Sequence, residues 1–600
     1  MTRHTIKGAA FAAAALIVSL APAVAPTPGY AVCAASVRYA ATTNAIYLTA
    51  PQPYTLTAIK QACPSAPLAQ VDPAGKVWQL NADLVLQNGS TLVLHGGTAG
   101  DVNALRLRSL PSNKPTEVSQ VMANHGTIDI KATKVTSWDP GANGPDTNVQ
   151  TAAGGRGRAF IRAISTQGPD GAARESRLNI VDSELSYLGY YGAESYGVAY
   201  KSRACTRTTV ALCAKVKVSG AQINSRFHHN FMGTYAWGAR DMTFRGNTYS
   251  NNVSYGLDPH DVSSNLVIER NTAAHNGSHG IICSQLCDRL RIVGNASHDN
   301  GHTPWAKPGD DPAIKRQVHG IMLHRGITNT LIADNRVWNH PNGAGIAVFD
   351  SSGNTLTRNR LDNNMVGIRL SVGSAKNVVS QNTVRRSAKA GLFMYKGNDP
   401  VAYTTASGRP TGNVFDRNVF EGGENPVKVT DSDATTIAGG AFIGRGPVAF
   451  VNSTATIADP AGTLRLDVGA GSTVDITSRA GRVLGAGTTV TPGGSRLRVA
   501  GPKVATVTLL PLTAVPSAGT ATASPVRSAT PGRGHGLRIS GLPAKASLRV
   551  TLGGLWGGVP YSVRRGATVV ATVTASRDGV VRFTDAPPTV GTHQYSVAPR

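Results

Sequence analysis

The sequence predicts an all-β protein whose main body is a right-handed parallel β-helix, with an N-terminal β-rich cap and a small C-terminal β-sandwich-like module. The first observation is an asparagine, in half of the repeats followed by a second asparagine five residues later, which recurs in steps of 23, 24, 24, 40, 24, 23 and 36 residues. The two long steps are one period plus an insertion. The repeats begin at Asn224, Asn247, Asn271, Asn295, Asn335, Asn359, Asn382 and Asn418.

The second observation is the kind of segment that lies between the asparagines. Residues 265–269 and 329–333 are short runs of alternating apolar and polar character, which is typical of strands. No segment of this region has an apolar period of 3.6 residues, and the leucine consensus of a leucine-rich repeat is missing. Each coil therefore supplies about three short strands, and asparagines at one point of each coil are expected to stack into a ladder.

The 600 residues divide into five expected parts. Residues 1–31 are predicted to be a signal peptide, and 32–154 an N-terminal cap. Residues 155–500 are expected to form the β-helix with an active-site groove. A segment rich in Pro, Ala, Ser, Thr and Gly suggests a linker at 501–535, and alternating residues at 536–600 suggest the β-sandwich-like module.

The N-terminus predicts export of the protein. Arg3 and Lys7 precede an apolar run at about 9–20, which is too short to span a bilayer and is followed by small residues. We therefore expect a secreted protein, extracellular or in the cell envelope. Six cysteines in such a protein suggest disulfides, although fifteen connectivities are possible. The local pairs are Cys33–Cys63, Cys205–Cys213 and Cys283–Cys287.

The net charge of +25 predicts affinity for a polyanion. The charge itself does not choose between acidic polysaccharide, nucleic acid and an anionic envelope, and it also serves solubility. Together with the fold, we expect an anionic polysaccharide as partner, no nucleic acid, no membrane insertion and a monomer.

The segment 255–261, Tyr-Gly-Leu-Asp-Pro-His-Asp, has the residue types of a reaction centre. Tyr255 offers a phenol, Asp258 and Asp261 offer carboxylates, and His260 offers an imidazole. The carboxylates are near enough in sequence to orient the imidazole or to shift its pKa.

The repeat register places this segment among other functional side chains. Immediately before the repeating glycine, Tyr255, His279 and His319 fall in one column. Arg325 and Arg289 are in position to face an anionic ligand. Asp310 and Asp311 lie in the insertion 301–316, which forms either a wall of the groove or a surface excursion. Four residues after each glycine, a second column contains Trp237, His260, Ser284, His324, Phe349, Ser371 and Tyr395.

The segment 255–261 resembles the DPHD signature of mannuronan C5-epimerases, the secreted β-helix enzymes that convert mannuronate to guluronate within alginate. Residues 186–190, 194–198 and 279–282 agree with this resemblance, which spans about 158–391. The resemblance implies an enzyme of the isomerase class that acts on polymeric mannuronate. It implies no required cofactor and no metal ligand in this chain, with Ca²⁺ as a possible aid to substrate binding.

Epimerisation at C5 removes a proton from one face of the sugar ring and returns a proton to the other face. His260 is the expected base, oriented by Asp258 and Asp261, and Tyr255 is the expected acid; the two labels can be exchanged. Arg325, with His279 or His319, is expected to neutralise the substrate carboxylate. The remaining expected substrate-binding residues are His324, Arg289 and Trp237.

Two alternative functions remain open at the level of sequence, a polysaccharide lyase and a non-catalytic glycan-binding protein, and a third, a hydrolase, is disfavoured. A polysaccharide lyase would begin with the same proton abstraction and continue by β-elimination. A hydrolase needs two carboxylates that flank one bond, and Asp258 and Asp261 are too close in sequence for that role. A non-catalytic β-helix would bind an acidic glycan without changing it.

Overall fold

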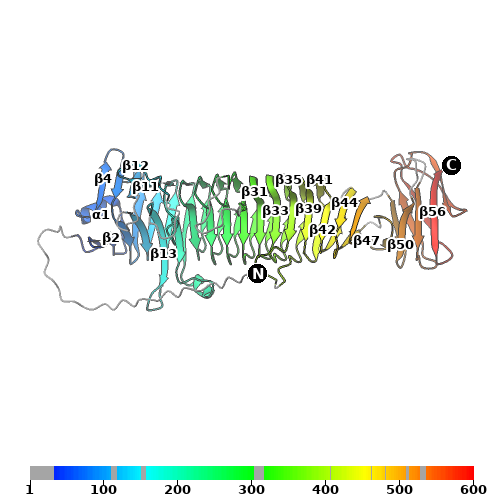
Figure 1. Ribbon diagram of the computed structural model, residues 1–600, viewed down its shortest axis with the longest axis horizontal. Coiled ribbons are helices and arrows are strands. Elements are labelled where there is room, and N and C mark those ends of the chain that lie inside the picture. Colours follow the sequence, from blue (N-terminus) through cyan, green and yellow to red (C-terminus); the bar gives the residue numbers. More distant parts are fainter. Residues whose placement is uncertain are drawn as a thin grey trace, which may run out of the picture.

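The protein is a long rod of stacked β-coils with a separate β-domain at its C-terminal end (Figure 1). The computed structural model describes residues 33–109, 118–149, 157–302, 317–405, 407–460, 463–479, 482–508, 512–526 and 535–600. The expected signal peptide and the insertion residues Asp310 and Asp311 lie outside these ranges. Within them, no helix has the length and apolar character needed to cross a membrane.

Three parallel sheets run along the rod, because each coil contributes one short strand to each sheet and then turns. We call the sheet that carries the segment 255–261 the groove sheet. Its strands are β2 (Ala45–Leu48), β6 (Asp83–Leu86), β9 (Gln120–Asn124), β13 (Phe160–Gln167), β17 (Gly197–Ser202), β20 (Met232–Trp237), β23 (Leu257–His260), β26 (Ile281–Ser284), β29 (Ile321–His324), the second halves of β31 (Arg336–Phe349) and β33 (Arg360–Ser371), β36 (Ala390–Tyr395), β39 (Asn425–Thr430), β42 (Val448–Val451) and β44 (Thr463–Val468).

The second sheet precedes the groove sheet in each coil. Its strands are β5 (Val77–Leu80), β8 (Ala104–Arg108), β11 (Lys134–Asp139), β16 (Glu184–Ser186), β19 (Arg226–His228), β22 (Thr248–Ser250), β25 (Thr272–Ala274), β28 (Ala296–His298), the first halves of β31 and β33, β35 (Thr383–Ser387), β38 (Val419–Gly422) and β41 (Ala441–Gly444).

The third sheet completes the coil. Its strands are β3 (Pro53–Tyr54), β7 (Ser90–His95), β10 (Gly126–Lys131), β15 (Ser176–Val181), β18 (Val218–Ile223), β21 (Thr243–Arg245), β24 (Val267–Glu269), β27 (Arg291–Val293), β30 (Leu331–Ala333), β32 (Thr355–Thr357), β34 (Val378–Ser380), β37 (Val414–Asp416), β40 (Thr435–Ala438), β43 (Thr454–Ala458) and β45 (Thr473–Ser478).

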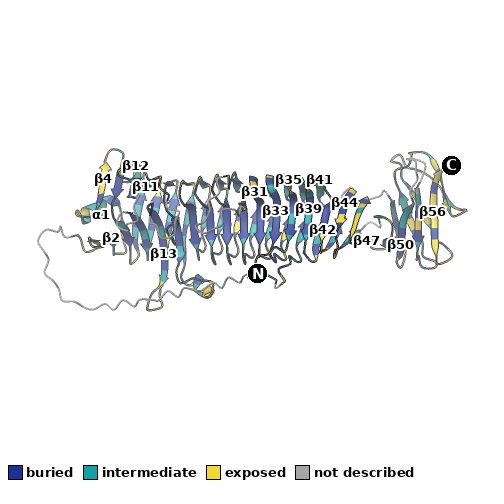
Figure 2. Cartoon of the chain, in the orientation of Figure 1, coloured by how far each residue is buried: buried dark blue, intermediate teal, exposed yellow. Residues whose placement is uncertain are grey.

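Apolar side chains form one continuous core along the inside of the rod, and the strands of the rod consist largely of buried residues (Figure 2). In the third sheet, Ile268, Ile292 and Ile332 are register partners in successive coils, and all three are fully buried. Each buried isoleucine contributes roughly 1.5–3 kcal/mol relative to an exposed one. The repeating glycine lets neighbouring coils approach closely, since a Cβ on Gly256 would lie 2.5 Å from the carbonyl oxygen of Gly280.

Buried asparagines form hydrogen-bonded ladders at the turns, as the repeat predicts. Asn271 Oδ1 accepts from the main-chain N–H and from the side-chain amide of Asn247, and Asn271 Nδ2 donates to Phe244 O and to Asn295 Oδ1. The expected first rung, Asn224, is wrong by one residue, because Ser225 occupies the ladder position and its main-chain N–H donates to Asn247 Oδ1. Asn224 instead adopts the left-handed backbone conformation, with φ of 49°.

The N-terminal end has both parallel coils and a cap. Helix α1 (Leu56–Ala62) and the antiparallel pairs of β1 (Val37–Ala40) with β2 and of β4 (Leu68–Asp72) with β5 cover this end. Parallel pairing already begins between β2 and β6. The β-helix therefore starts before the expected boundary at 155. Two short strands, β12 (Gly144–Pro145) and β14 (Ala173–Arg174), form small antiparallel excursions.

The C-terminal β-domain has its own core and begins earlier than the sequence predicts. This core extends from Val483 to Val597, so the expected start at 536 is wrong. The described residues of 501–535 form strands and not a linker. Their small apolar residues alternate with polar ones, and their main chains pair with those of neighbouring strands. These strands are β48 (Lys503–Thr508), which pairs with β44, β49 (Leu512–Pro516), which pairs with β52, and β50 (Ala521–Val526), which pairs with β46 and β51.

Two sheets make up this β-domain. The smaller sheet has the order β49, β52 (Leu548–Leu552), β55 (Val581–Asp585). The larger one contains β47 (Gly494–Ala500), β46 (Thr488–Thr491), β50, β51 (His535–Ser540), β56 (Thr592–Pro599), β53 (Pro560–Arg565) and β54 (Thr568–Thr574).

The three local disulfides suggested by the cysteine spacing are all present: Cys33–Cys63, Cys205–Cys213 and Cys283–Cys287. Cys205 and Cys213 close an excursion between β17 and β18, which contains the short 3₁₀ helix η2 (Val210–Ala214). This excursion lies next to the groove sheet, because Trp237 Nε1 donates a hydrogen bond to Cys205 O at 2.8 Å.

Candidate active site

The segment 255–261 contains strand β23 of the groove sheet and the residues that flank it. Leu257 points into the core, so the strand alternation directs Asp258 and His260 to the outer face. In the preceding coil, Tyr235 is the register partner of Asp258 and Trp237 that of His260. The segment therefore contributes its titratable groups to a surface that several coils build together.

The structure reproduces the column predicted four residues after each repeating glycine. Every neighbouring pair is a parallel register pair, from Trp237–His260 to Ser371–Tyr395. The His260 ring is stacked on the Trp237 ring, with centroids 5.5 Å apart and an angle of 14°. Trp237 therefore fixes the plane of the imidazole from one side.

The column immediately before the glycine is also formed. The rings of Tyr255 and His279 are stacked with centroids 5.5 Å apart, and those of His279 and His319 with centroids 5.1 Å apart. Tyr255 and His279 are half-buried, whereas His319 is 1% exposed. Two of the three rings thus remain accessible to a ligand.

His319 holds other protein groups instead of facing solvent. Its Nδ1 accepts from the main-chain N–H of Ala344 at 2.8 Å, and its Nε2 lies 2.9 Å from Arg369 NH2. Burial, and then the charge of Arg369, lower the pKa of His319 well below its usual range. The expected role of His319 as a direct substrate ligand does not fit this position, because the ring is covered.

A third column, between the two predicted ones, contains the predicted residue Asp258 and two functional groups that were not predicted, Tyr235 and Arg369. Tyr235, Asp258 and Arg369 all lie two residues after a repeating glycine. Tyr235 pairs in register with Asp258, and Arg369 occupies the same column farther along the rod. Extending the register argument to this position would have found Tyr235 and Arg369.

Asp258 is a buried carboxylate without a hydrogen-bond partner. It is 1% exposed, and within the described part of the chain neither Oδ1 nor Oδ2 is hydrogen-bonded. Burial, reinforced by the charge of Asp261, raises the pKa of Asp258 to about 7, although the His260 charge opposes the rise. Such a group is costly for stability and is characteristic of a functional site.

His260 lies between two carboxylates and two aromatic rings. Its Nδ1 is 3.3 Å from Asp261 Oδ1, and its ring centroid is 5.4 Å from that of Tyr235. Burial by itself would lower the pKa of His260, but the charges of Asp258 and Asp261 outweigh it, and the pKa is raised. Burial, and then the Asp258 charge, raise the pKa of Tyr235 far above its usual value.

The excursion closed by Cys205 and Cys213 brings a cation to this group. Arg207 Nε lies 3.2 Å from Asp261 Oδ2, and Arg207 NH1 donates to Gln285 Oε1 at 2.6 Å. Asp261 is fully buried, while about half of the Arg207 side chain is exposed. Arg207 lies outside the repeat register, so the sequence pattern did not predict its contact with Asp261.

A second excursion, in the range 396–412, closes the same side of the groove sheet. Tyr403 Oη donates to Gln285 Oε1 at 3.3 Å, and Asp350 is fully buried and accepts from Thr404 Oγ1 at 2.7 Å. Arg325 NH1 donates to Pro400 O at 3.2 Å. Gln285 therefore joins the two excursions.

Two expected binding residues occupy different environments. The half-buried ring of His324 packs against Phe349, and burial followed by the Arg325 charge lowers the His324 pKa to about 4. Arg289 is exposed at the next turn of the coil, where NH1 pairs with Asp288 Oδ2 at 2.7 Å. Arg289 is thus paired at a turn and does not join the group around His260.

A cavity of about 200 Å³ continues the outer face of the groove sheet toward the C-terminus. Its lining combines cations with aromatic rings, including Arg369, Lys389, Lys428, Phe393 and Tyr395. Arg369 connects this cavity to His319, so the basic surface is physically joined to the histidine column.

Comparison with known proteins first defines the class. The family described as "Right handed beta helix region" matches residues 173–311 and 313–407. The periplasmic alginate epimerase AlgG has a similar fold, with a TM-score of 0.51 and 22% identity over 66% of this chain and 82% of that chain. The predicted fold class, a right-handed parallel β-helix, is therefore confirmed.

Within this class, the chain is similar to proteins named mannuronan C5-epimerase, in agreement with the resemblance of the segment 255–261. The enzyme of that name from Pseudomonas putida is 27% identical over 311 residues, covering 52% of this chain and 51% of the relative. Mannuronan C5-epimerase AlgG of Azotobacter vinelandii is 29% identical over 312 residues, covering 51% and 50%. The chain spans about half the length of the curated relatives it matches.

Proposed function

We propose that the protein is a secreted polyuronate-modifying enzyme that epimerises mannuronate at C5 within an alginate-like polysaccharide. The observation that carries this proposal is the buried carboxylate of Asp258 beside His260 on the outer face of the groove sheet, which has no hydrogen-bond partner among the described residues. A carboxyl group and an imidazole with raised pKa values supply proton-transfer groups that change charge near neutral pH.

In the proposed reaction, His260 removes the C5 proton, and its imidazole becomes positively charged. Asp261, 3.3 Å from His260 Nδ1, orients the ring and stabilises that charge. Asp258 raises the basicity of His260. The electron pair left at C5 delocalises into the sugar carboxylate, which requires nearby cations or hydrogen-bond donors.

A tyrosine returns a proton to the opposite face of C5. Tyr255 is the proposed acid, because it is half-buried and is held against the His279 ring. Tyr235 is a second candidate, since its ring lies 5.4 Å from that of His260. The roles of tyrosine and histidine exchange when the reaction runs in reverse.

The substrate carboxylates are proposed to meet the cations around the groove. Arg207 lies nearest to the reaction centre through its contact with Asp261, and Arg325 borders the same side. Lys201 Nζ lies 3.8 Å above the Trp237 ring, which is stacked on His260. Their positive charge would attract a polyuronate and support the charge that develops during proton removal.

The test is incubation of purified protein with polymannuronate in deuterated water, followed by proton NMR. We expect guluronate signals and deuterium at C5, without a requirement for a cofactor and with activity retained in a chelator. An ultraviolet-absorbing unsaturated product would instead identify a β-eliminating lyase. Binding of the polymer without any new product would identify a glycan-binding β-helix.

A further inference from the structure

The turn that leads from the second sheet into the groove sheet carries a group of potential metal ligands. His275 and Asp299 occupy the same position of this turn in neighbouring coils, since the main-chain N–H of His275 donates to His298 O and that of Asp299 donates to Trp338 O. His298 ends strand β28 directly before Asp299. Two coils therefore contribute two imidazoles and one carboxylate to one place.

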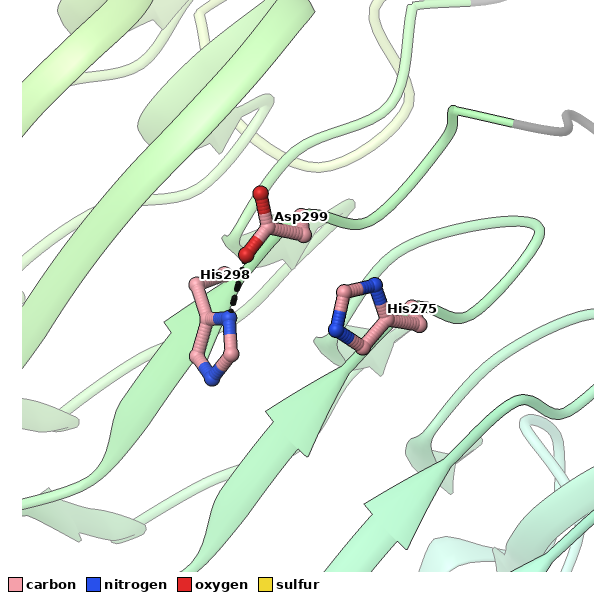
Figure 3. A group of neighbouring side chains, drawn as sticks. All are labelled: His275, His298 and Asp299. Carbon is pink, nitrogen blue, oxygen red and sulfur yellow. Dashed lines mark hydrogen bonds and ion pairs between the residues drawn. The ribbon is translucent and has the colours of Figure 1, made fainter.

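These three side chains are close enough to bind one ion. One ligand atom from each residue lies within 4.8 Å of the others. The rings of His275 and His298 are nearly perpendicular, with centroids 5.7 Å apart, and His298 Nδ1 is 2.6 Å from Asp299 Oδ2. Figure 3 shows one ring nitrogen of His275 facing the His298 ring.

Neighbouring residues hold two of the ligands in place. Asn339 Nδ2 donates to Asp299 Oδ1 at 3.0 Å, and the Trp338 ring is stacked on His298 at 4.1 Å. His302 Nε2 lies 3.7 Å from Asp299 Oδ1.

We propose that His275, His298 and Asp299 form a binding site for a first-row transition-metal ion such as Zn²⁺, with His302 at its edge. Two imidazoles and one carboxylate are the donors preferred by Zn²⁺, Cu²⁺ and Ni²⁺, whereas Ca²⁺ and Mg²⁺ prefer oxygen donors. The outer contacts from Asn339 and Trp338 match the orienting interactions of metal-bound side chains. A bound ion would join two adjacent coils at this turn.

The proposal is tested by titrating the full, untagged chain with ZnCl₂ in a calorimeter. We expect one saturable site per chain, which a large excess of CaCl₂ does not displace. His275→Asn is the informative variant, because Asn251 and Asn339 occupy the same turn position in nearby coils and asparagine tolerates its left-handed backbone, with φ of 56° at His275. This variant should bind Zn²⁺ at least about tenfold more weakly.

His95→Ala is the matched control. His95 Nε2 also pairs with a carboxylate of a neighbouring coil, Asp129 Oδ2 at 2.8 Å. Within the described residues, no third potential metal ligand lies close enough to this pair to complete a site. The control should keep the Zn²⁺ affinity. Asp299→Asn provides a second variant and should also weaken binding. Unchanged Zn²⁺ affinity in His275→Asn, or displacement of Zn²⁺ by Ca²⁺, would overturn the proposal.

Discussion

Two sets of buried polar groups lie in the same β-helix, and they differ in whether their polar atoms have hydrogen-bond partners. In the asparagine ladder, the Asn271 side chain makes hydrogen bonds with both of its neighbouring rungs. In the groove sheet, Asp258 is equally buried, yet within the described residues neither of its oxygens has a hydrogen-bond partner.

The difference separates groups that stabilise the rod from groups that the rod holds ready for chemistry. A satisfied buried amide contributes to stability, whereas an unsatisfied buried carboxylate costs stability and shifts its pKa. Stacked coils impose the backbone position of Asp258, so the ladders help to offset its cost. Substitutions in the two sets should therefore affect different measured quantities.

The largest effect is expected from His260→Ala, which removes the proposed base. Loss of a general base should lower kcat by about a thousandfold. The melting temperature should change much less than the activity, because the half-buried His260 ring packs against Trp237 and Tyr235 on the outer face and not into the core inside the rod. Turnover is measured by NMR on polymannuronate, and thermal unfolding by circular dichroism. Full activity in this variant would refute His260 as the base.

The second prediction concerns Asp258→Asn and the pH dependence of stability. The folded-state pKa of Asp258, about 7, lies above its unfolded value of about 3.9. The folded state therefore binds more protons between these values, and this group's contribution to stability is lost as pH rises from about 4 to 7. The Asn variant should show a smaller decrease in unfolding free energy across this window.

Chemical denaturation at several pH values between 4 and 8 measures this difference. Asp467→Asn is a suitable comparison because Asp467 is an exposed aspartate. It should follow the native pH dependence. The same slope in Asp258→Asn and in the native protein would contradict a carboxyl group with a raised pKa. Activity should fall in Asp258→Asn, since the basicity of His260 depends on this charge.

The third prediction concerns the asparagine ladder. Asn271→Ala leaves the main-chain N–H of Asn247 and the carbonyl of Phe244 without their partner, and should lower the unfolding free energy by about 2 kcal/mol. Activity per folded molecule should be retained. Asn398→Ala is the control, because Asn398 is exposed. Equal stability of the two variants would contradict the stabilising role of the ladder.

The repeat made much of the rod and its columns predictable. A period of about 24 residues assigns each residue a position in a coil, and so Trp237, His260 and His324 could be aligned without coordinates. The register could not show how deeply each side chain is buried. His319 is buried because Arg369, 50 residues farther along the chain, lies against it. That contact depends on side-chain packing across coils.

Features outside the repeat were the least predictable. Arg207 reaches Asp261 from a disulfide-closed excursion, and no period relates their sequence positions. The C-terminal boundary was misplaced for a different reason. Strands β48 to β50 have a composition that resembles a linker, but their alternation lets them pair with β44, β46 and β52.

The smallest predicted effect concerns Arg207, the half-exposed cation that pairs with Asp261 at the groove. Arg207→Gln removes a surface-exposed partner, so kcat should fall by about tenfold or less. The Arg207 charge lowers the pKa of His260, and its removal should therefore raise that pKa. The acidic limb of the pH–rate profile should move to higher pH, because the base must be neutral to accept a proton.

Arg207→Lys keeps the positive charge and should restore the native profile. Arg174→Gln is the matched control, since Arg174 forms an exposed pair with Asp170 in the hairpin of β13 and β14. A purely structural role for Arg207 would lower kcat without moving the pH profile. A shifted profile that lysine restores would instead show that the positive charge of Arg207 sets the pKa of His260. The polar groups that matter for chemistry would then include a residue of the excursion as well as residues of the coils.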